Sequence, residues 1–93
     1  MNKKKLNIAR NKIDKIDNKI LALIKRRTRI VKYMVSLKLY RKQIVDTKRM
    51  NYILKKIKRK SLQNKIDPMI TERIWKSMIG AYIDYQKRNF KKK

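Results

Sequence analysis

Apolar residues recur every three or four positions from Leu6 to Arg41, and this pattern constrains the fold more than any other feature of the chain. Such spacing places side chains on one face of an α-helix, which has about 3.6 residues per turn. The predicted helix runs from about Leu6 to about Arg41 and would be about 50 Å long. Two cations interrupt its apolar stripe. The members of the stripe are Leu6, Ala9, Ile13, Ile16, Ile20, Leu23, Arg27, Val31, Met34 and Lys38.

Two shorter helices are predicted after the long one. Asp46 is placed to cap a helix over residues 46–63, because a short acidic side chain can accept from the first free N–H groups. Asp67 is placed to cap another over residues 67–90, and Pro68 suits its first turn, where a missing N–H costs little. One glycine and one proline are too few turn residues for a hairpin-rich fold. We therefore expect an all-α fold in one domain covering residues 1–93.

The long helix carries more apolar surface than two shorter helices can cover. A three-helix monomer would leave much of this stripe in water. An antiparallel pair of long helices from two chains, each flanked by its own shorter helices, would bury it. We therefore predict an intertwined homodimer, in which Arg10 of one chain can approach Arg27 and Lys38 of the other.

Charge points to an anionic ligand. The chain has 30 lysines and arginines against 6 aspartates and glutamates, a net charge of +24. A buried cation without a counter-charge is costly, and the few acids cannot neutralise every base, so we expect a bound anion near Arg27 and Lys38. The chain has no cysteine or histidine, which removes thiolate chemistry and the commonest metal ligand and general base. We predict no metal and no cofactor.

Localisation and the class of partner follow from what the chain lacks. No apolar run reaches the roughly 18 residues of a membrane span, and the lysine-rich start leads into a periodic helix instead of a signal-peptide core. We expect a soluble, cytoplasmic protein without a membrane partner. A basic nucleic-acid-binding helical protein is an alternative, but it would carry its bases on one face with interleaved aromatic residues. Here bases surround every predicted helix, so we expect no specific nucleic acid.

The ordered set Arg10, Arg27, Lys38, Arg49 and Gln86 on three predicted helices resembles the all-helical chorismate mutase family. The likeness includes the stretches Arg10–Asp17, Leu23–Arg27 and Asp46–Arg49 and so covers essentially the whole chain. The resemblance implies an intertwined three-helix homodimer. It also implies the pericyclic rearrangement of chorismate to prephenate, a step of phenylalanine and tyrosine biosynthesis that requires no nucleophile, metal or cofactor.

The resemblance implies a role for each matching residue. Arg10 of the partner chain, Arg27 and Arg49 would bind the carboxylates of the dianionic substrate. Lys38 would contact a carboxylate and the breaking ether oxygen, and Gln86 would donate to the same oxygen, so Lys38, Gln86 and Arg27 are the predicted catalytic residues. Asp46 lies in the segment that adjoins the substrate hydroxyl in the family, although its position favours a helix cap.

Two positions depart from the mutase pattern. Met50 stands where mutases of the family usually carry a glutamate that contacts the ring hydroxyl, and Tyr82 stands where many carry a serine. Both residues resemble those of the related isochorismate pyruvate lyase, which converts isochorismate to salicylate and pyruvate in the same kind of pocket. Mutases are far more common, so a mutase is the first expectation and the lyase is the alternative. An inactive relative that serves as a structural dimer is a further alternative.

Overall fold

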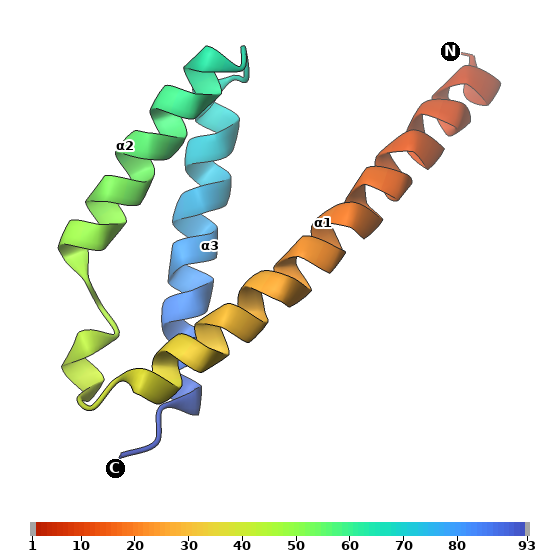
Figure 1. Ribbon diagram of the computed structural model, residues 1–93. Helices are drawn as coiled ribbons and strands as arrows, with labels where there is room; N and C mark the ends of the chain where they lie inside the picture. Colours follow the sequence, from red (N-terminus) through yellow and green to blue (C-terminus); the bar gives the residue numbers. More distant parts are fainter. Residues whose placement is uncertain (1, 93) are drawn as a thin grey trace. The chain divides into compact units, whose positions relative to one another are not determined.

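The computed structural model describes residues 2–92, which form three α-helices and one short 3-10 helix and contain no strand. The elements are α1 (Lys3–Leu37), η1 (Arg41–Gln43), α2 (Thr47–Gln63) and α3 (Pro68–Asn89), as Figure 1 shows. The predicted all-α class is confirmed. Met1 and Lys93, the end residues of the predicted domain, lie outside the described residues.

The chain divides into two compact units, Met1–Val31 and Lys32–Lys93. The first unit consists of the larger part of α1. The second contains the C-terminal end of α1 together with η1, α2 and α3. The prediction of one domain over residues 1–93 stays a prediction.

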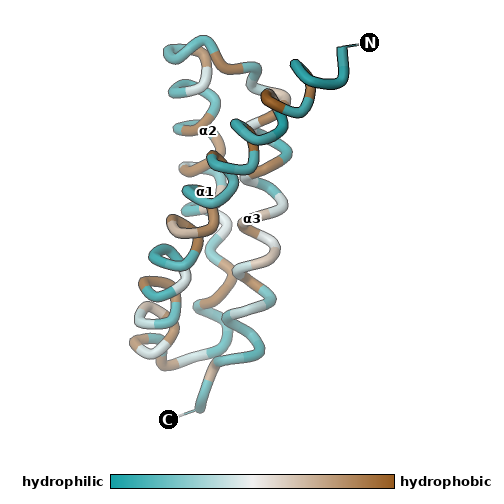
Figure 2. The backbone as a smooth tube through the Cα atoms, turned by 90° about the vertical axis from the view of Figure 1, so that its right-hand side faces the viewer, coloured by the Kyte–Doolittle hydropathy of each residue, from teal (hydrophilic) through white to brown (hydrophobic). Residues whose placement is uncertain are grey.

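The apolar stripe of α1 is exposed in the first unit. Ile13 is 57% exposed, Ile16 54% and Leu23 57%. Figure 2 shows apolar positions in brown recurring among polar ones in teal along α1. An apolar face of this length is unfavourable in water, because each of its side chains keeps most of its hydration cost.

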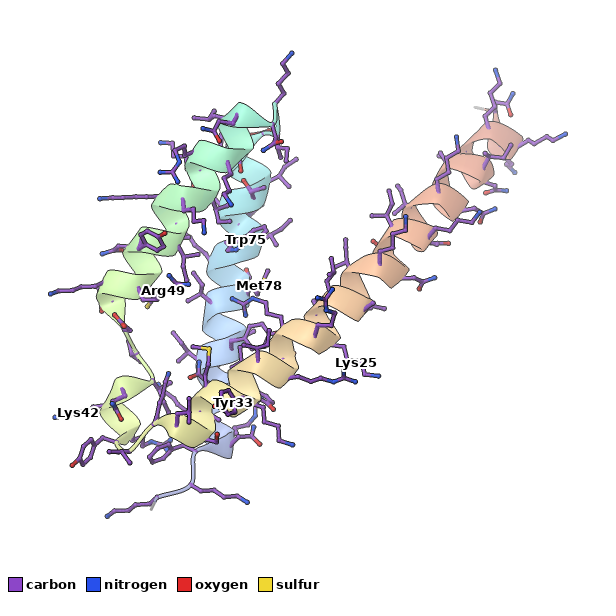
Figure 3. The ribbon with its side chains drawn as sticks, in the orientation of Figure 1. Lys25, Tyr33, Lys42, Arg49, Trp75 and Met78 are labelled. Carbon is purple, nitrogen blue, oxygen red and sulfur yellow. The ribbon has the colours of Figure 1, made fainter. Side chains whose placement is uncertain are left out.

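α2 and α3 lie side by side in the second unit (Figure 1) and pack against each other. The face of α2 that carries Met50, Ile53, Leu54 and Ile57 is half-buried, and its spacing is that of an amphipathic helix. On α3, Ile79 is buried. Trp75 and Met78, which are labelled in Figure 3, are half-buried on the same helix.

The turn between α2 and α3 is closed by hydroxyl and backbone hydrogen bonds. Ser61 is buried, and its Oγ donates to the Ile57 carbonyl at 2.6 Å. Ser61 Oγ and Thr71 Oγ1 also share a hydrogen bond at 2.7 Å, which ties α2 to α3. Beyond the helix end, the Ile66 N–H donates to the Ser61 carbonyl at 2.8 Å, and Lys65 has a φ of 56°. This is a Schellman ending, in which the left-handed residue is usually glycine.

Both predicted aspartate caps are confirmed. Oδ1 of Asp46 accepts from the Arg49 N–H at 3.0 Å at the start of α2. Oδ1 of Asp67 accepts from the Met69 N–H at 2.9 Å at the start of α3, where Pro68 occupies the first turn. The two shorter helices therefore begin within one residue of the predicted positions.

The predicted end of the long helix at about Arg41 is wrong. α1 ends at Leu37, so Lys38 lies just beyond the helix and is not one of its stripe positions. The N–H of Lys38 bonds to the Val35 carbonyl at 3.2 Å, a tightened last turn. The N–H groups of Leu39 and Tyr40, which would have continued the helix, donate to Oε1 of Gln43 instead.

A search of the helices within residues 2–92 finds none with the length and apolar content of a membrane span.

Candidate functional site

Lys38 and Gln86 meet in the second unit, although they are far apart in the sequence. Nζ of Lys38 donates to Oε1 of Gln86 at 2.7 Å, and both side chains are half-buried. Burial lowers the pKa of the Lys38 ammonium below its ordinary value of 10.5, because the charged form loses hydration. The negative charge of Asp46 acts in the opposite direction and raises this pKa. The structure therefore brings the two residues predicted to act on the ether oxygen into direct contact.

The bond to Lys38 fixes the orientation of the Gln86 carboxamide. Because Oε1 accepts, the Nε2 group has two N–H donors that this bond does not use. The ammonium has three donors and places one of them on Gln86. The pair can thus direct N–H groups from two side chains, one of them a cation, at a common acceptor.

Asp46 combines a cap with an electrostatic contact to Lys38. Its carboxylate caps α2 through the Arg49 N–H, and its charge acts on the Lys38 ammonium. Lys38, Gln43 and Asp46 line an open hollow of about 480 Å³, together with Val45, Thr47 and Lys48. The interpretation of Asp46 as a cap is confirmed, while a direct role toward a substrate stays a prediction.

Arg49 is exposed near the start of α2, where Figure 3 labels it. Its guanidinium lies over the ring of Tyr52, with Cζ 5.2 Å from the ring centroid. Lys56 places its Nζ 5.9 Å from the same centroid. Arg49 therefore rests on its own helix, held by a cation–π contact that is weak at an exposed position.

The two residues that depart from the mutase pattern are half-buried on the packed helices. Met50 follows Asp46 by one turn, and its N–H donates to the Asp46 carbonyl at 3.0 Å. Tyr82 precedes Gln86 by one turn on α3, so the two side chains share a helix face. Its ring meets the ring of Tyr85 edge-on, with the centroids 6.4 Å apart.

Arg10 and Arg27 belong to the first unit and lie on α1. Arg10 is exposed and Arg27 is half-buried. At 1.5 Å per residue they are about 25 Å apart along the helix axis, farther than two arginine side chains can bridge around one small molecule. Arg10 and Arg27 of the same chain therefore cannot hold one ligand together.

The connector between α1 and α2, which carries Gln43 and Ile44, was not predicted. Ile44 is 4% exposed and Gln43 holds the bend after Lys38. The predicted long helix extends to about Arg41 and therefore includes the start of this connector. A usable signal was present, because the polar run Arg41–Gln43 breaks the apolar spacing before Ile44 and the Asp46 cap.

One comparison with known proteins found a match. Residues 9–87 match the family model of chorismate mutase type II, and this range includes every predicted site residue. Searches of curated proteins and of solved structures found no match. The three-helix, all-α architecture is consistent with the matched family. Since the match spans most of the sequence, the chain belongs to the chorismate mutase type II family.

Proposed function

We propose that the protein is a chorismate mutase, which rearranges chorismate to prephenate in a cationic pocket shared by two copies of the chain. Membership of the chorismate mutase type II family supports an enzyme of this kind. The observation that carries the proposal is the contact between Lys38 Nζ and Gln86 Oε1 at 2.7 Å. It joins the two residues that would act on the breaking ether bond.

The rearrangement needs placement and charge stabilisation, and no group of the enzyme has to form a bond to the substrate. Negative charge develops on the ether oxygen as its bond to the ring carbon breaks. The Lys38 ammonium and the Nε2 group of Gln86 would donate to this oxygen, and a preorganised donor of this kind contributes about 10²–10³ in rate. Holding the side chain of the substrate over its ring contributes the remaining acceleration through proximity.

The arginines would bind the two carboxylates. The Arg49 guanidinium lies over the ring of Tyr52, a contact worth about 0.5–1 kcal/mol at an exposed site. A hydrogen bond to a charged group contributes about 1.5–3 kcal/mol, so a substrate carboxylate would displace the ring. Arg27 would bind from α1, and forked arginine–carboxylate pairs would fix the substrate in orientation as well as in position.

The second copy of the chain would complete the site. Arg10 is too far from Arg27 along α1 to act in the same chain, so its predicted role requires a partner. The exposed stripe of α1 supports the same conclusion, because Ile13, Ile16 and Leu23 are each more than half exposed. Antiparallel pairing of two α1 helices would cover this stripe and carry Arg10 of one copy toward Arg27 of the other.

Isochorismate pyruvate lyase is the second candidate, and Met50 and Tyr82 are the observations that favour it. Met50 is half-buried and apolar, so it offers no acceptor to the ring hydroxyl of chorismate. Tyr82 lies one turn before Gln86 on α3 and brings a bulky ring to the same helix face. A lyase would use the same cations, since its reaction is also pericyclic and its substrate is also a dianion.

Parallel assays with chorismate and isochorismate test the proposal. A faster rearrangement of chorismate is expected, and Met50→Glu is expected to increase it, because a carboxylate would accept from the ring hydroxyl. Met69→Glu, at a position on α3 that is 74% exposed, is the matched control for the added charge. If the wild-type protein releases pyruvate from isochorismate much faster, and Met50→Glu reverses that preference, the mutase assignment is wrong and the lyase is correct.

A further inference from the structure

The bend that follows α1 is held by one side chain. Oε1 of Gln43 accepts from the Leu39 N–H at 2.8 Å and from the Tyr40 N–H at 2.8 Å. A carboxamide oxygen has two lone pairs, so both bonds can form at once. These are the two residues directly after Lys38. Gln43 therefore sets the path of the backbone at the point where the Lys38 side chain leaves it.

The connector is also anchored at its far end and against α3. Within it, the Gln43 N–H donates to the Tyr40 carbonyl at 3.0 Å and the Ile44 N–H to the Arg41 carbonyl at 3.1 Å. Ile44 is buried. Nη1 of Arg41 donates to the Lys87 carbonyl at 3.3 Å, one of the last-turn carbonyls of α3 that has no partner within the helix. Lys87 follows Gln86, so the connector and the partner of Lys38 are held in register.

A lysine side chain depends strongly on such support. Its long flexible stem gives the ammonium many possible positions, and the direction of that stem follows the backbone from which it starts. The Lys38 N–H is bonded to the Val35 carbonyl on one side, and the next two N–H groups are bonded to Gln43 on the other. Removing the Gln43 oxygen would break the bonds to the Leu39 and Tyr40 N–H groups and leave the bond between the Lys38 N–H and the Val35 carbonyl in place.

We propose that Gln43 is a positioning residue that acts through Lys38: its carboxamide oxygen fixes the bend so that Nζ of Lys38 stays within hydrogen-bonding distance of Gln86. The inference rests on the proposed function, in which Lys38 and Gln86 donate to the ether oxygen. It assigns to Gln43 no contact with the reacting atoms.

The charges that face Lys38 determine how its pKa would change if its side chain moved. Asp46 faces it from the start of α2 and raises its pKa, Lys48 lines the same hollow, and α3 presents the neutral Gln86. Arg41 on the connector is directed at the Lys87 carbonyl. Because burial is the larger influence and lowers the pKa of Lys38, a Lys38 that moves into water regains hydration, and its pKa rises toward the ordinary value.

Three variants of the full chain test the proposal. Gln43→Met keeps the length of the side chain and removes the carboxamide oxygen, whereas Gln43→Glu keeps an oxygen that can accept both bonds. Gln63→Met makes the same replacement at an exposed position at the end of α2 and is the control. For each variant, kcat and KM are measured, and the pH dependence of Lys38 acetylation is followed by peptide mass spectrometry.

The expected result for Gln43→Met is a loss in kcat of about 10- to 100-fold, since a misplacement of about 1 Å can cost about 10²-fold, together with an acetylation profile of Lys38 that shifts to higher pH. Gln43→Glu should keep most of the kcat, and Gln63→Met should match the wild type. Wild-type kcat and an unshifted Lys38 profile in Gln43→Met overturn the proposal.

The remaining outcomes also decide the question. If Gln43→Met does not fold, as judged by circular dichroism, a folded Gln43→Glu that has lost kcat overturns the proposal, and an active one supports it. If the wild-type protein turns over neither chorismate nor isochorismate, the proposed function has failed, and the acetylation profiles of Lys38 still decide whether Gln43 positions it.

Discussion

Replacing Gln86 by glutamate tests whether the Nε2 group of Gln86 acts as a hydrogen-bond donor in the reaction. In the wild-type structure Oε1 of Gln86 accepts from Lys38 at 2.7 Å, and Nε2 remains to donate. The variant carboxylate would keep the acceptor and lose the donor. It would also pair with the Lys38 ammonium and stabilise its protonated form. The substitution would therefore remove the proposed Gln86 donor to the ether oxygen without breaking the contact to Lys38.

The expected loss of rate follows from the pKa of the variant carboxyl group and from the rate contribution of one donor. A glutamate has an ordinary pKa of about 4.3, and a cation in contact lowers it by about 1–3 units. At pH 7 fewer than about 1 in 5,000 of the variant carboxyl groups would then be protonated and able to donate. Molecules that lack the donor still turn over, slower by about 10²–10³, which corresponds to about 2.7–4 kcal/mol. This second route sets the expected loss at pH 7, and recovery should begin between about pH 3 and pH 6, where the protonated fraction exceeds this residual rate.

The assay is the consumption of chorismate, or of isochorismate if the lyase is correct, measured from about pH 3 to pH 8 to include the pH range in which recovery is expected. Gln63→Glu adds the same charge at the exposed end of α2 and should retain the wild-type profile. A Gln86→Glu variant with the wild-type rate at pH 7 would refute the donor role. A rate that is lost and does not recover in acid would refute it as well, because protonation restores a donor at that position.

Four further predictions concern stability, pH and assembly. Wild-type kcat/KM should fall in alkaline solution at a pH below the ordinary lysine pKa of 10.5, because Lys38 must be protonated to donate and burial lowers its pKa. The folded state also binds this proton more weakly than the unfolded chain. The free energy of unfolding should therefore increase as pH rises from the lowered pKa toward 10.5, which denaturation at several pH values can measure. Asp46→Ala should cost about 0.5–2 kcal/mol of stability by removing the cap of α2, whereas Asp46→Asn should keep the cap; acetylation profiles should show a further lowered Lys38 pKa in both. Lys65→Gly should stabilise the protein by up to about 1 kcal/mol in urea denaturation, since glycine adopts the left-handed conformation without strain. Sedimentation should find a dimer, and a folded monomer that is fully active at low concentration would contradict the shared site.

The parts of the fold that follow from local chemistry could be predicted. Asp46 and Asp67 were identified as caps because a cap depends on a short polar side chain that can accept from the N–H groups two or three residues after it. The end of α1 could not be placed in the same way. It depends on Gln43 accepting from Leu39 and Tyr40 across a bend, and a helical period contains no information about such a bond.

The candidate site needed more than periodicity. Lys38 and Gln86 are separated by 48 positions in the sequence, and no spacing rule brings two such residues together. Their pairing was expected only because the ordered set of cations and one glutamine resembles the chorismate mutase family. Gln43 was missed because the resemblance assigned it no role and because the predicted helix ended only two residues before it.

A second copy that covers the exposed stripe of α1 must approach a chain of like charge. Each copy carries a net charge of +24, and two copies repel each other over about a Debye length, roughly 10 Å at 0.1 M salt. Added salt therefore favours the pairing of two stripes, while it weakens the attraction of the same field for a dianion. In the proposed dimer, dilute enzyme would be limited by assembly at low salt and by substrate capture at high salt. Its turnover per chain should pass through a maximum between these limits, so in that assembly the excess of lysine and arginine would give the enzyme an optimal ionic strength.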